Sequence, residues 1–287
     1  MKKKNIILIL IFILILYFQS AAQVSPGAKQ IALSHSDAAQ SNDVFALFGN
    51  SAGLAQMNWR EVGIYYSPSP FGVKELANAY AAYIEPFSFG NISVGYMQYG
   101  FELYKENKVA LSFSRNIDNN FFIGVTALYQ NLSIERYGND NAVTINLGGL
   151  YYLSEDTRIA MYAQNLFRAT YGKESDQIPF IMGFGASHDF NSLITFNASV
   201  EKEIDFDPSF RFGVEYSLIE YVTLRTGFMS EPSSYSVGLG IHYSFVTLDY
   251  AFFSHPDLGL THQAGIIIDF NPSSPRKEKI KNYLFNK

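Results

Sequence analysis

The sequence predicts an all-β protein: a transmembrane antiparallel β-barrel of about 14 strands behind a short, partly helical N-terminal plug segment. Three observations predict this fold. The chain begins with an export signal, it alternates apolar and polar residues from Glu61 to Phe270, and turn residues separate the alternating runs. Period-two alternation over short segments is typical of strands that have one face in an apolar medium.

The export signal comprises residues 1–22. Lys2, Lys3 and Lys4 precede an apolar run over 6–18, and small residues for cleavage follow at 20–22. This order is typical of a secretory signal peptide. The alternative is a retained membrane anchor, for which the run is short. We expect the mature chain to begin near residues 22–24.

Composition narrows the class of protein. The chain has 20 Tyr and 25 Phe but one Trp, and it has no cysteine, which excludes disulfides, thiolate metal sites and thiol nucleophiles. Losing the three signal lysines takes the formal charge from −5 to about −8. An acidic mature chain argues against nucleic acid as a partner, because phosphates require clustered Lys and Arg.

The alternating runs give the expected strands. They cover 61–67, 76–86, 90–99, 107–115, 121–134, 142–153, 157–166, 179–189, 193–203, 209–217, 221–229, 235–243, 246–253 and 260–270. Fourteen is an even number, as single-chain bacterial barrels have, and the number falls to 12 if the first hairpin belongs to the plug. In the last run Ala264, Ile266, Ile268 and Phe270 share the outward face, so Phe270 is the expected closing-strand signal.

The connections are expected to alternate in length. Short turns such as 116–120, 154–157 and 190–192 alternate with longer polar loops such as 67–75, 100–107 and 167–178. Short periplasmic turns and long extracellular loops are typical of outer-membrane barrels. A soluble β-sandwich is the alternative fold, because it also alternates and it would bury the apolar face.

Residues 23–60 and 271–287 flank the expected barrel of 61–270. The first segment is apolar but does not alternate as a strand does. We expect it to contain a short helix that Asp43 caps and Gly49 ends. We expect the segment either to plug the lumen or to lie along the periplasmic mouth. The second is a basic tail of formal charge +4, which we expect to be periplasmic, exposed and mobile.

Charged residues on the late strands share the inward face of the expected barrel. They are Glu201, Arg211, Glu215, Arg225, Asp249 and Asp269. They form either a charged lining for a polar conduit or a dock for the plug, or else a self-neutralising interior network across adjacent strands. The inward glycines Gly213, Gly227, Gly238, Gly240 and Gly265 leave room for either the plug or a ligand.

The sequence does not predict an enzyme, a metal site or a cofactor. Of the five histidines, His188 and His262 are expected on the lipid face and His242 on the inward face, and no serine lies in a nucleophile-elbow pattern. No histidine pair or aspartate cluster has metal-ligand spacing.

Two stretches resemble the family of the fatty-acid channel FadL and the PorV/PorQ proteins of Bacteroidota. The first is Asn50, Ser51, Ala52, Gly53, Leu54 and Ala55, close to an Asn-Pro-Ala-Gly-Leu-Ala motif that ends the family's N-terminal segment, with Ser51 in place of Pro. The second is Gln164-Asn165-Leu166 with Ile178-Pro179 opening the next strand. The start of the mature chain near Gln23 also resembles exported proteins of Bacteroidota.

The resemblance implies a 14-stranded barrel of a Gram-negative outer membrane, in contact with its lipid. It favours a PorV/PorQ-like accessory barrel of type IX protein secretion, with secretion components or cargo as partners. The alternatives are a FadL-like passive channel, with a hydrophobic ligand or detergent in the lumen, and a structural or adhesive surface barrel without transport.

Overall fold

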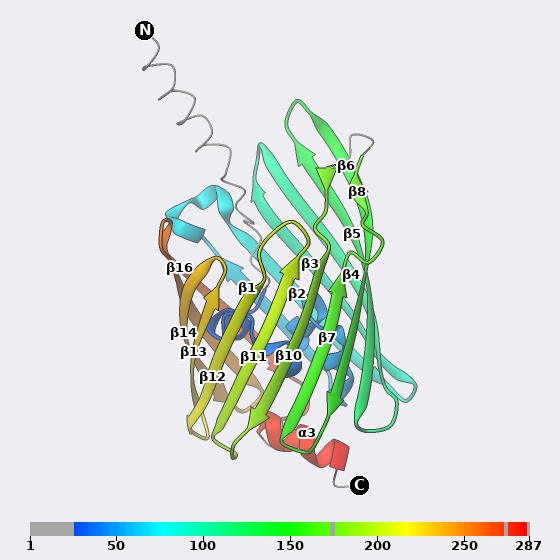
Figure 1. Cartoon of the computed structure of the whole chain (residues 1–287), viewed down its shortest axis with the longest axis vertical. Helices are drawn as coiled ribbons and strands as arrows, with labels where there is room; N and C mark the ends of the chain where they lie inside the picture. The colour runs from blue at the N-terminus through cyan, green and yellow to red at the C-terminus, as the bar shows by residue number, and fades with distance from the viewer. Residues whose placement is uncertain (1–25, 173–175, 273–274, 286–287) are drawn as a thin grey trace.

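A computed structural model describes residues 26–172, 176–272 and 275–285, so the expected signal peptide lies outside the described residues. The described chain is a closed antiparallel barrel of 14 strands. Each strand pairs with its neighbour along the chain, apart from the small β8–β9 ribbon between β7 and β10, and β1 closes the barrel on β16. The expected fold and the larger of the two expected strand counts are confirmed (Figure 1).

The barrel strands lie within a few residues of the expected ranges. They are β1 (Glu61–Ser67), β2 (Asn78–Phe87), β3 (Gly90–Phe101), β4 (Tyr104–Asn116), β5 (Phe121–Ile134), β6 (Gly138–Tyr152), β7 (Thr157–Gln164), β10 (Ile181–Asp189), β11 (Ile194–Glu203), β12 (Ser209–Ile219), β13 (Val222–Ser230), β14 (Ser233–Tyr243), β15 (Val246–His255) and β16 (Gly259–Asp269). The ribbon consists of β8 (Thr170–Tyr171) and β9 (Asp176–Gln177).

The outward face of the barrel is apolar and exposed. In β14, Val237, Leu239 and Ile241 are each more than a third exposed, while Ser234 and Ser236, on the opposite face of the same strand, are buried. A β-sandwich would bury its apolar face between two sheets. A closed barrel with exposed Leu, Ile, Phe and Tyr therefore excludes the sandwich and fits an apolar surrounding medium.

The two ends of the barrel differ less than the sequence suggests. At one end, here called the turn end, six connections of two to four residues join the strands, namely 88–89, 117–120, 153–156, 190–193, 220–221 and 244–245. At the opposite loop end, several expected long loops are short. Strands β3 and β4 continue to a two-residue connection at 102–103, and β13 and β14 to one at 231–232. The polar residues next to these two connections continue the hydrogen-bonded pairing of β3 with β4 and of β13 with β14 in an unbroken register.

Long connections at the loop end are 68–77, which contains η4 (Pro70–Gly72) and η5 (Lys74–Leu76), and 165–180, which contains the ribbon.

The lumen is filled by residues 26–60, here called the plug segment. It comprises α2 (Ala28–Ala32), η1 (Asp37–Ala39), η2 (Val44–Phe48) and η3 (Ser51–Gln56). These short helices lie inside the barrel wall in Figure 1, and their apolar side chains form one buried core with inward wall residues.

The tail differs from the sequence expectation. Residues 276–285 form an ordered helix, α3 (Arg276–Phe285), which lies across the turn end (Figure 1). Ile280 and Leu284 are buried, so α3 belongs to the core rather than to a mobile terminus. Within the described residues, no helix is both long enough and apolar enough to cross a membrane.

Candidate functional site: an occupied lumen

Two side-chain caps shape the plug segment. Asp43 precedes η2 and its Oδ1 accepts from Phe45 N at 3.0 Å, and Asn50 precedes η3 and its Oδ1 accepts from Ala52 N at 3.2 Å. Asp and Asn favour such positions because they satisfy amides that a helix start leaves free. The helix expected between Asp43 and Gly49 therefore exists, with 3₁₀ rather than α geometry.

Asp43 also ties the two halves of the plug segment together. Its carboxylate lies 3.0 Å from Lys29 Nζ and accepts from Gln30 Nε2 at 2.8 Å. Burial alone would raise the pKa of Asp43, but the charges of Lys29 and Arg276 and the hydrogen bonds from Lys29 and Gln30 together hold this pKa below its ordinary value. A buried ion pair between two of its own residues thus holds the plug segment together inside the lumen.

Glycines of the wall make room for this unit. A Cβ at Gly227 would lie 2.5 Å from the carbonyl carbon of Leu33, and one at Gly238 would lie 2.4 Å from Ala32 Cβ. Among the described residues, the inward glycines that face plug atoms in this way are Gly63, Gly95, Gly124, Gly148, Gly185, Gly213, Gly227, Gly238 and Gly265. We call them the glycine wall. Three of the five glycines noted in the sequence leave space that the plug fills, Gly265 would keep an ordinary contact of 3.7 Å with Ala28 even with a Cβ, and Gly240 leaves space for Arg225 and Asp249 instead.

The Asn50–Ala55 motif lies where the plug segment meets the wall of β4, β5 and β6. Asn50 Nδ2 donates to Ala38 O at 3.0 Å and to Gly149 O at 3.2 Å. Ala52 and Leu54 are fully buried, and a Cβ on Gly53 would lie 2.0 Å from Ser41 O. These contacts explain the small residues of the motif.

The inward charges pair with one another. Arg225 Nε lies 2.8 Å from Glu215 Oε2, and Arg225 Nη1 lies 2.6 Å from Asp249 Oδ1. Arg211 Nη1 donates to Glu201 Oε2 at 3.0 Å. Five of the six residues therefore pair across strands in two groups, Glu201 with Arg211, and Glu215 and Asp249 with Arg225. The second group also contacts the plug, because Gln40 Nε2 donates to Glu215 Oε1 at 3.1 Å.

Two titratable groups of the plug segment are buried in this region. Burial raises the pKa of Asp37 to about 6, against the opposing charge of Lys29, with Asp43 adding to the rise. Burial and the nearby charge of Arg211 lower the pKa of His35 to about 3, so its imidazole is neutral at physiological pH. The protonated form of Asp37 is therefore favoured in the folded chain compared with a solvent-exposed aspartate.

Aromatic side chains fill the loop-end half of the lumen beneath β1–β4. The rings of Phe48 and Tyr80 are 5.1 Å apart, those of Tyr65 and Tyr80 are 5.8 Å apart, and those of Tyr99 and Tyr104 are 6.3 Å apart, all edge to face. We call Tyr65, Tyr80, Tyr99 and Tyr104 the tyrosine cluster. Its rings are packed together, and its hydroxyls bond to polar side chains, since Tyr65 Oη donates to Gln263 Oε1 at 3.0 Å and Tyr104 Oη donates to Glu106 Oε1 at 2.6 Å.

At the turn end, Asp269 pairs with the tail rather than with a neighbouring strand. Lys279 Nζ lies 2.5 Å from Asp269 Oδ2. Phe270 follows directly after β16, is 59% exposed, and its backbone N donates to Arg60 O at 3.1 Å. Phe270 thus lies on the outer surface at the closing seam.

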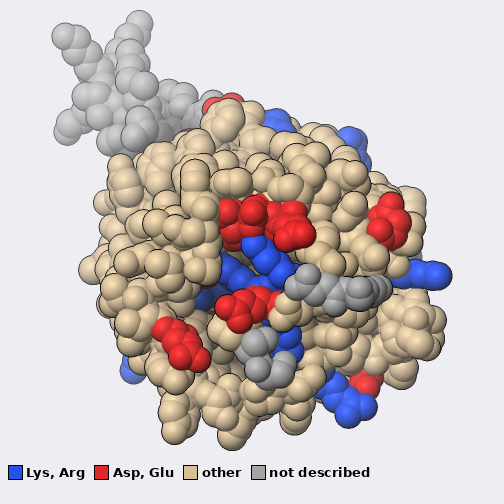
Figure 2. Space-filling model, turned by 90° about the horizontal axis from the view of Figure 1, so that it is seen from below, with Lys and Arg blue, Asp and Glu red and all other residues tan. Residues whose placement is uncertain are grey.

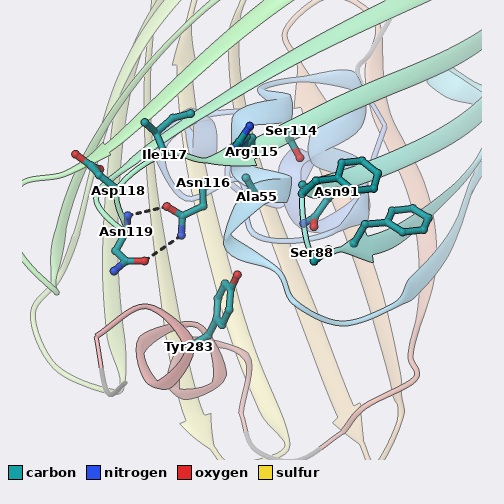
Figure 3. A pocket seen from close by; sticks show the side chains of 13 residues that line it. Ala55, Ser88, Asn91, Ser114, Arg115, Asn116, Ile117, Asp118, Asn119 and Tyr283 are labelled. Carbon is teal, nitrogen blue, oxygen red and sulfur yellow. Dashed lines mark hydrogen bonds between the residues drawn. The ribbon is translucent and has the colours of Figure 1, made fainter.

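A polar pocket of about 380 Å³ opens beside α3 (Figure 3). It lies between the turns 88–89 and 117–120, with Ala55 of the plug segment and Tyr283 of α3 on its other sides. Asn116 and Asn119 bond to each other across the turn, and Asn91 donates to the carbonyls of Leu54 and Met57. The pocket is a gap between the mouth and α3 that leaves η3 close to solvent.

Sequence reasoning missed three features. Glu61 is fully buried at the start of β1, Arg158 pairs with Asp189 at 3.1 Å, and the basic residues of α3 reach the barrel mouth. The alternation of the strands places Glu61 and Asp189 on inward positions, so it could have identified both as lumen-facing charges.

Among the described residues, no group of three or more His, Asp or Glu side chains is placed to hold a metal ion.

Comparisons with known proteins support the fold. No family model matches the sequence, and no curated protein matches it. The toluene transporter TodX of P. putida superposes with a TM-score of 0.60 at 12% identity, over 86% of this chain and 97% of that one. A Pseudomonas aeruginosa FadL homologue gives 0.59 at 10% identity, over 86% and 97%. A TodX deletion mutant, described as a monoaromatic hydrocarbon channel, gives 0.61 at 10% identity, over 83% and 97%. The chain has the fold of these barrels.

Proposed function

We propose that the chain is a non-catalytic outer-membrane barrel through which hydrophobic small molecules pass, with the plug segment as its gate. The observation that carries this proposal is the tyrosine cluster, a group of packed aromatic rings between the plug and the loop end. Aromatic faces and edges bind apolar and aromatic ligands well. The shared fold with a toluene transporter supports the same ligand class.

Ligand retention and uptake test this function. Protein extracted in mild detergent should carry a hydrophobic ligand or detergent in native mass spectrometry, and proteoliposomes should take up toluene faster than empty vesicles. Tyr80→Ala should lower both signals, because it removes the ring between Phe48 and Tyr65. Tyr137→Ala is the matched control, since Tyr137 is 89% exposed outside the lumen. Equal uptake by protein-containing and empty vesicles would refute the proposal.

In this proposal the turn end faces the periplasm and the loop end faces outward, as in barrels with short periplasmic turns. The apolar outer face then contacts outer-membrane lipid. The resemblance of the plug motif favours a bacterium of the Bacteroidota as the source.

A second candidate function is that of an accessory barrel of type IX secretion. The motif Asn50–Ala55 favours it, because those residues seat the plug segment firmly against β5 and β6 and keep the lumen closed. A closed barrel suits a docking role for secretion components or cargo. Cross-linking in whole cells, followed by identification of the partners, separates the two candidates: recovery of a secretion channel or exported cargo supports docking, and recovery of this chain alone contradicts it.

A further inference from the structure

All four basic residues of α3 form ion pairs with carboxylates of the barrel. Arg276 pairs with Glu61 of β1 at 2.7 Å, Lys277 with Glu215 of β12 at 3.4 Å, Lys279 with Asp269, and Lys281 with Asp156 of the β6–β7 turn. Seen from the turn end, Lys and Arg side chains lie in a hollow with Asp and Glu on its edge (Figure 2). We call Glu61, Asp156, Asp189, Glu215 and Asp269 the carboxylate ring.

Arg276 links this helix to the plug segment. Its Nη1 donates to Asn42 O at 2.8 Å, while the same guanidinium pairs with Glu61. Glu61 in turn accepts from Val44 N at 2.9 Å and from Trp59 Nε1 at 3.2 Å. One buried carboxylate therefore joins the wall, the plug and α3.

The far end of α3 makes a second contact with the plug. The ring of Phe285 is 5.5 Å from the ring of Tyr152, and the Tyr152 hydroxyl bonds to Gln56 of η3. Between the two ends, Lys279 Nζ lies 3.9 Å above the ring of Trp59. Helix α3 thus braces the plug segment at both of its halves.

We propose that α3 is a latch that holds the plug in the lumen, and that the carboxylate ring is a docking site for a basic helix, occupied here by the chain's own tail. Removing α3 would leave the buried carboxylate of Glu61 without Arg276, the cation that pairs with it, an arrangement that a buried carboxylate tolerates poorly. Glu215 would lose Lys277 and keep Arg225. The vacated ring would therefore recognise a helical segment with closely spaced Lys and Arg, such as one from a periplasmic protein.

The absence of cysteine in the sequence allows a clean test. Ala46→Cys places a single thiol in η2, where the parent residue is 4% exposed. In the full chain, its modification rate by a membrane-impermeant maleimide should rise about tenfold or more in Arg276→Ala/Lys279→Ala, because each change breaks a buried charge pair. Glu278→Ala is the control, since Glu278 is exposed on α3 and outside these pairs. Heat-modifiable gel migration verifies that each barrel is closed.

Two further experiments, a charge swap and a peptide competition, test the docking site. Lys281→Asp alone should speed modification, and adding Asp156→Lys should slow it again, because the swap restores an opposite-charge pair at the rim. A synthetic peptide of residues 275–287 should slow modification of Arg276→Ala/Lys279→Ala, and a peptide with these basic residues replaced by Gln should not. Unchanged rates in a folded double variant would overturn the latch, and equal effects of both peptides would overturn the docking site. Neither readout depends on which molecule the barrel transports.

Discussion

Gly124→Ala tests whether the glycine wall seats the plug. Gly124 lies on the inward face of β5, where an added Cβ would lie 2.5 Å from Ala52 N and from the carbonyl carbon of Ser51. Ordinary contacts begin near 3.4 Å, so η3 must move by about 0.9 Å. Overpacking of this kind costs about 1–3 kcal/mol. At about 1.4 kcal/mol per factor of ten, the displaced plug becomes roughly 5- to 150-fold more populated.

The thiol at Ala46→Cys measures this displacement. We expect its modification rate to rise by that factor in Gly124→Ala, while gel migration still reports a closed barrel. Gly149→Ala is a matched control on β6, because the residue faces outward and its added Cβ would meet nothing closer than Met161 Cγ at 3.6 Å. Both changes add one methyl group to a strand glycine, so backbone effects are similar.

Equal modification rates for the Gly124→Ala and Gly149→Ala variants would refute the reasoning. They would mean that η3 does not rest against β5, or that the plug is exposed often enough in the parent protein for the wall to make no difference. A barrel that fails to close only in Gly124→Ala would point instead to a role of this glycine in the sheet.

Three other predictions follow from the described contacts. Arg225→Met should destabilise the barrel by about 3–5 kcal/mol in urea, because Asp249 stays buried without its cation and Glu215 keeps only Lys277; an unchanged midpoint would contradict the role of these ion pairs. Because burial raises the pKa of Asp37 from 3.8 to about 6, stability falls as pH rises between these two values and the loss is complete above pH 6. Unfolding followed by Trp59 fluorescence should therefore need more urea at pH 5 than at pH 7, and Asp37→Asn should lose that gain. Phe270→Ser should reduce outer-membrane yield, since an outward aromatic closes the last strand; normal yield would show that the seam does not need it.

The positions of the strands, and which side chains point inward or outward, were predictable because alternation has a period of two and each face of a strand meets a different medium. The outward row of β16 and the inward charges of β12, β13 and β15 follow from that rule alone. The Asp43 cap was also predictable, because a cap is local. Loop lengths at the loop end were overestimated, because polar residues in β3 and β4 pair beyond the apolar band.

The partners of the inward groups were not predictable. Whether Gly227 faced a ligand or Leu33 depends on how a segment almost 200 residues earlier in the chain folds, and no local pattern carries that information. The helix α3 was missed because its basic residues are typical of a solvated tail. They lie against the barrel mouth because carboxylates of the closed barrel, such as Glu61 and Glu215, are opposite them.

The ion pair between Glu61 and Arg276 has a consequence for assembly. Glu61 opens the first strand and Arg276 follows the last, so the pair spans the seam that β1 and β16 form. The cation reaches the carboxylate only when that seam is shut. An open sheet that already holds residues 26–60 therefore keeps an uncompensated buried charge. This penalty favours a folding order in which seam pairing and helix docking come together as the last step.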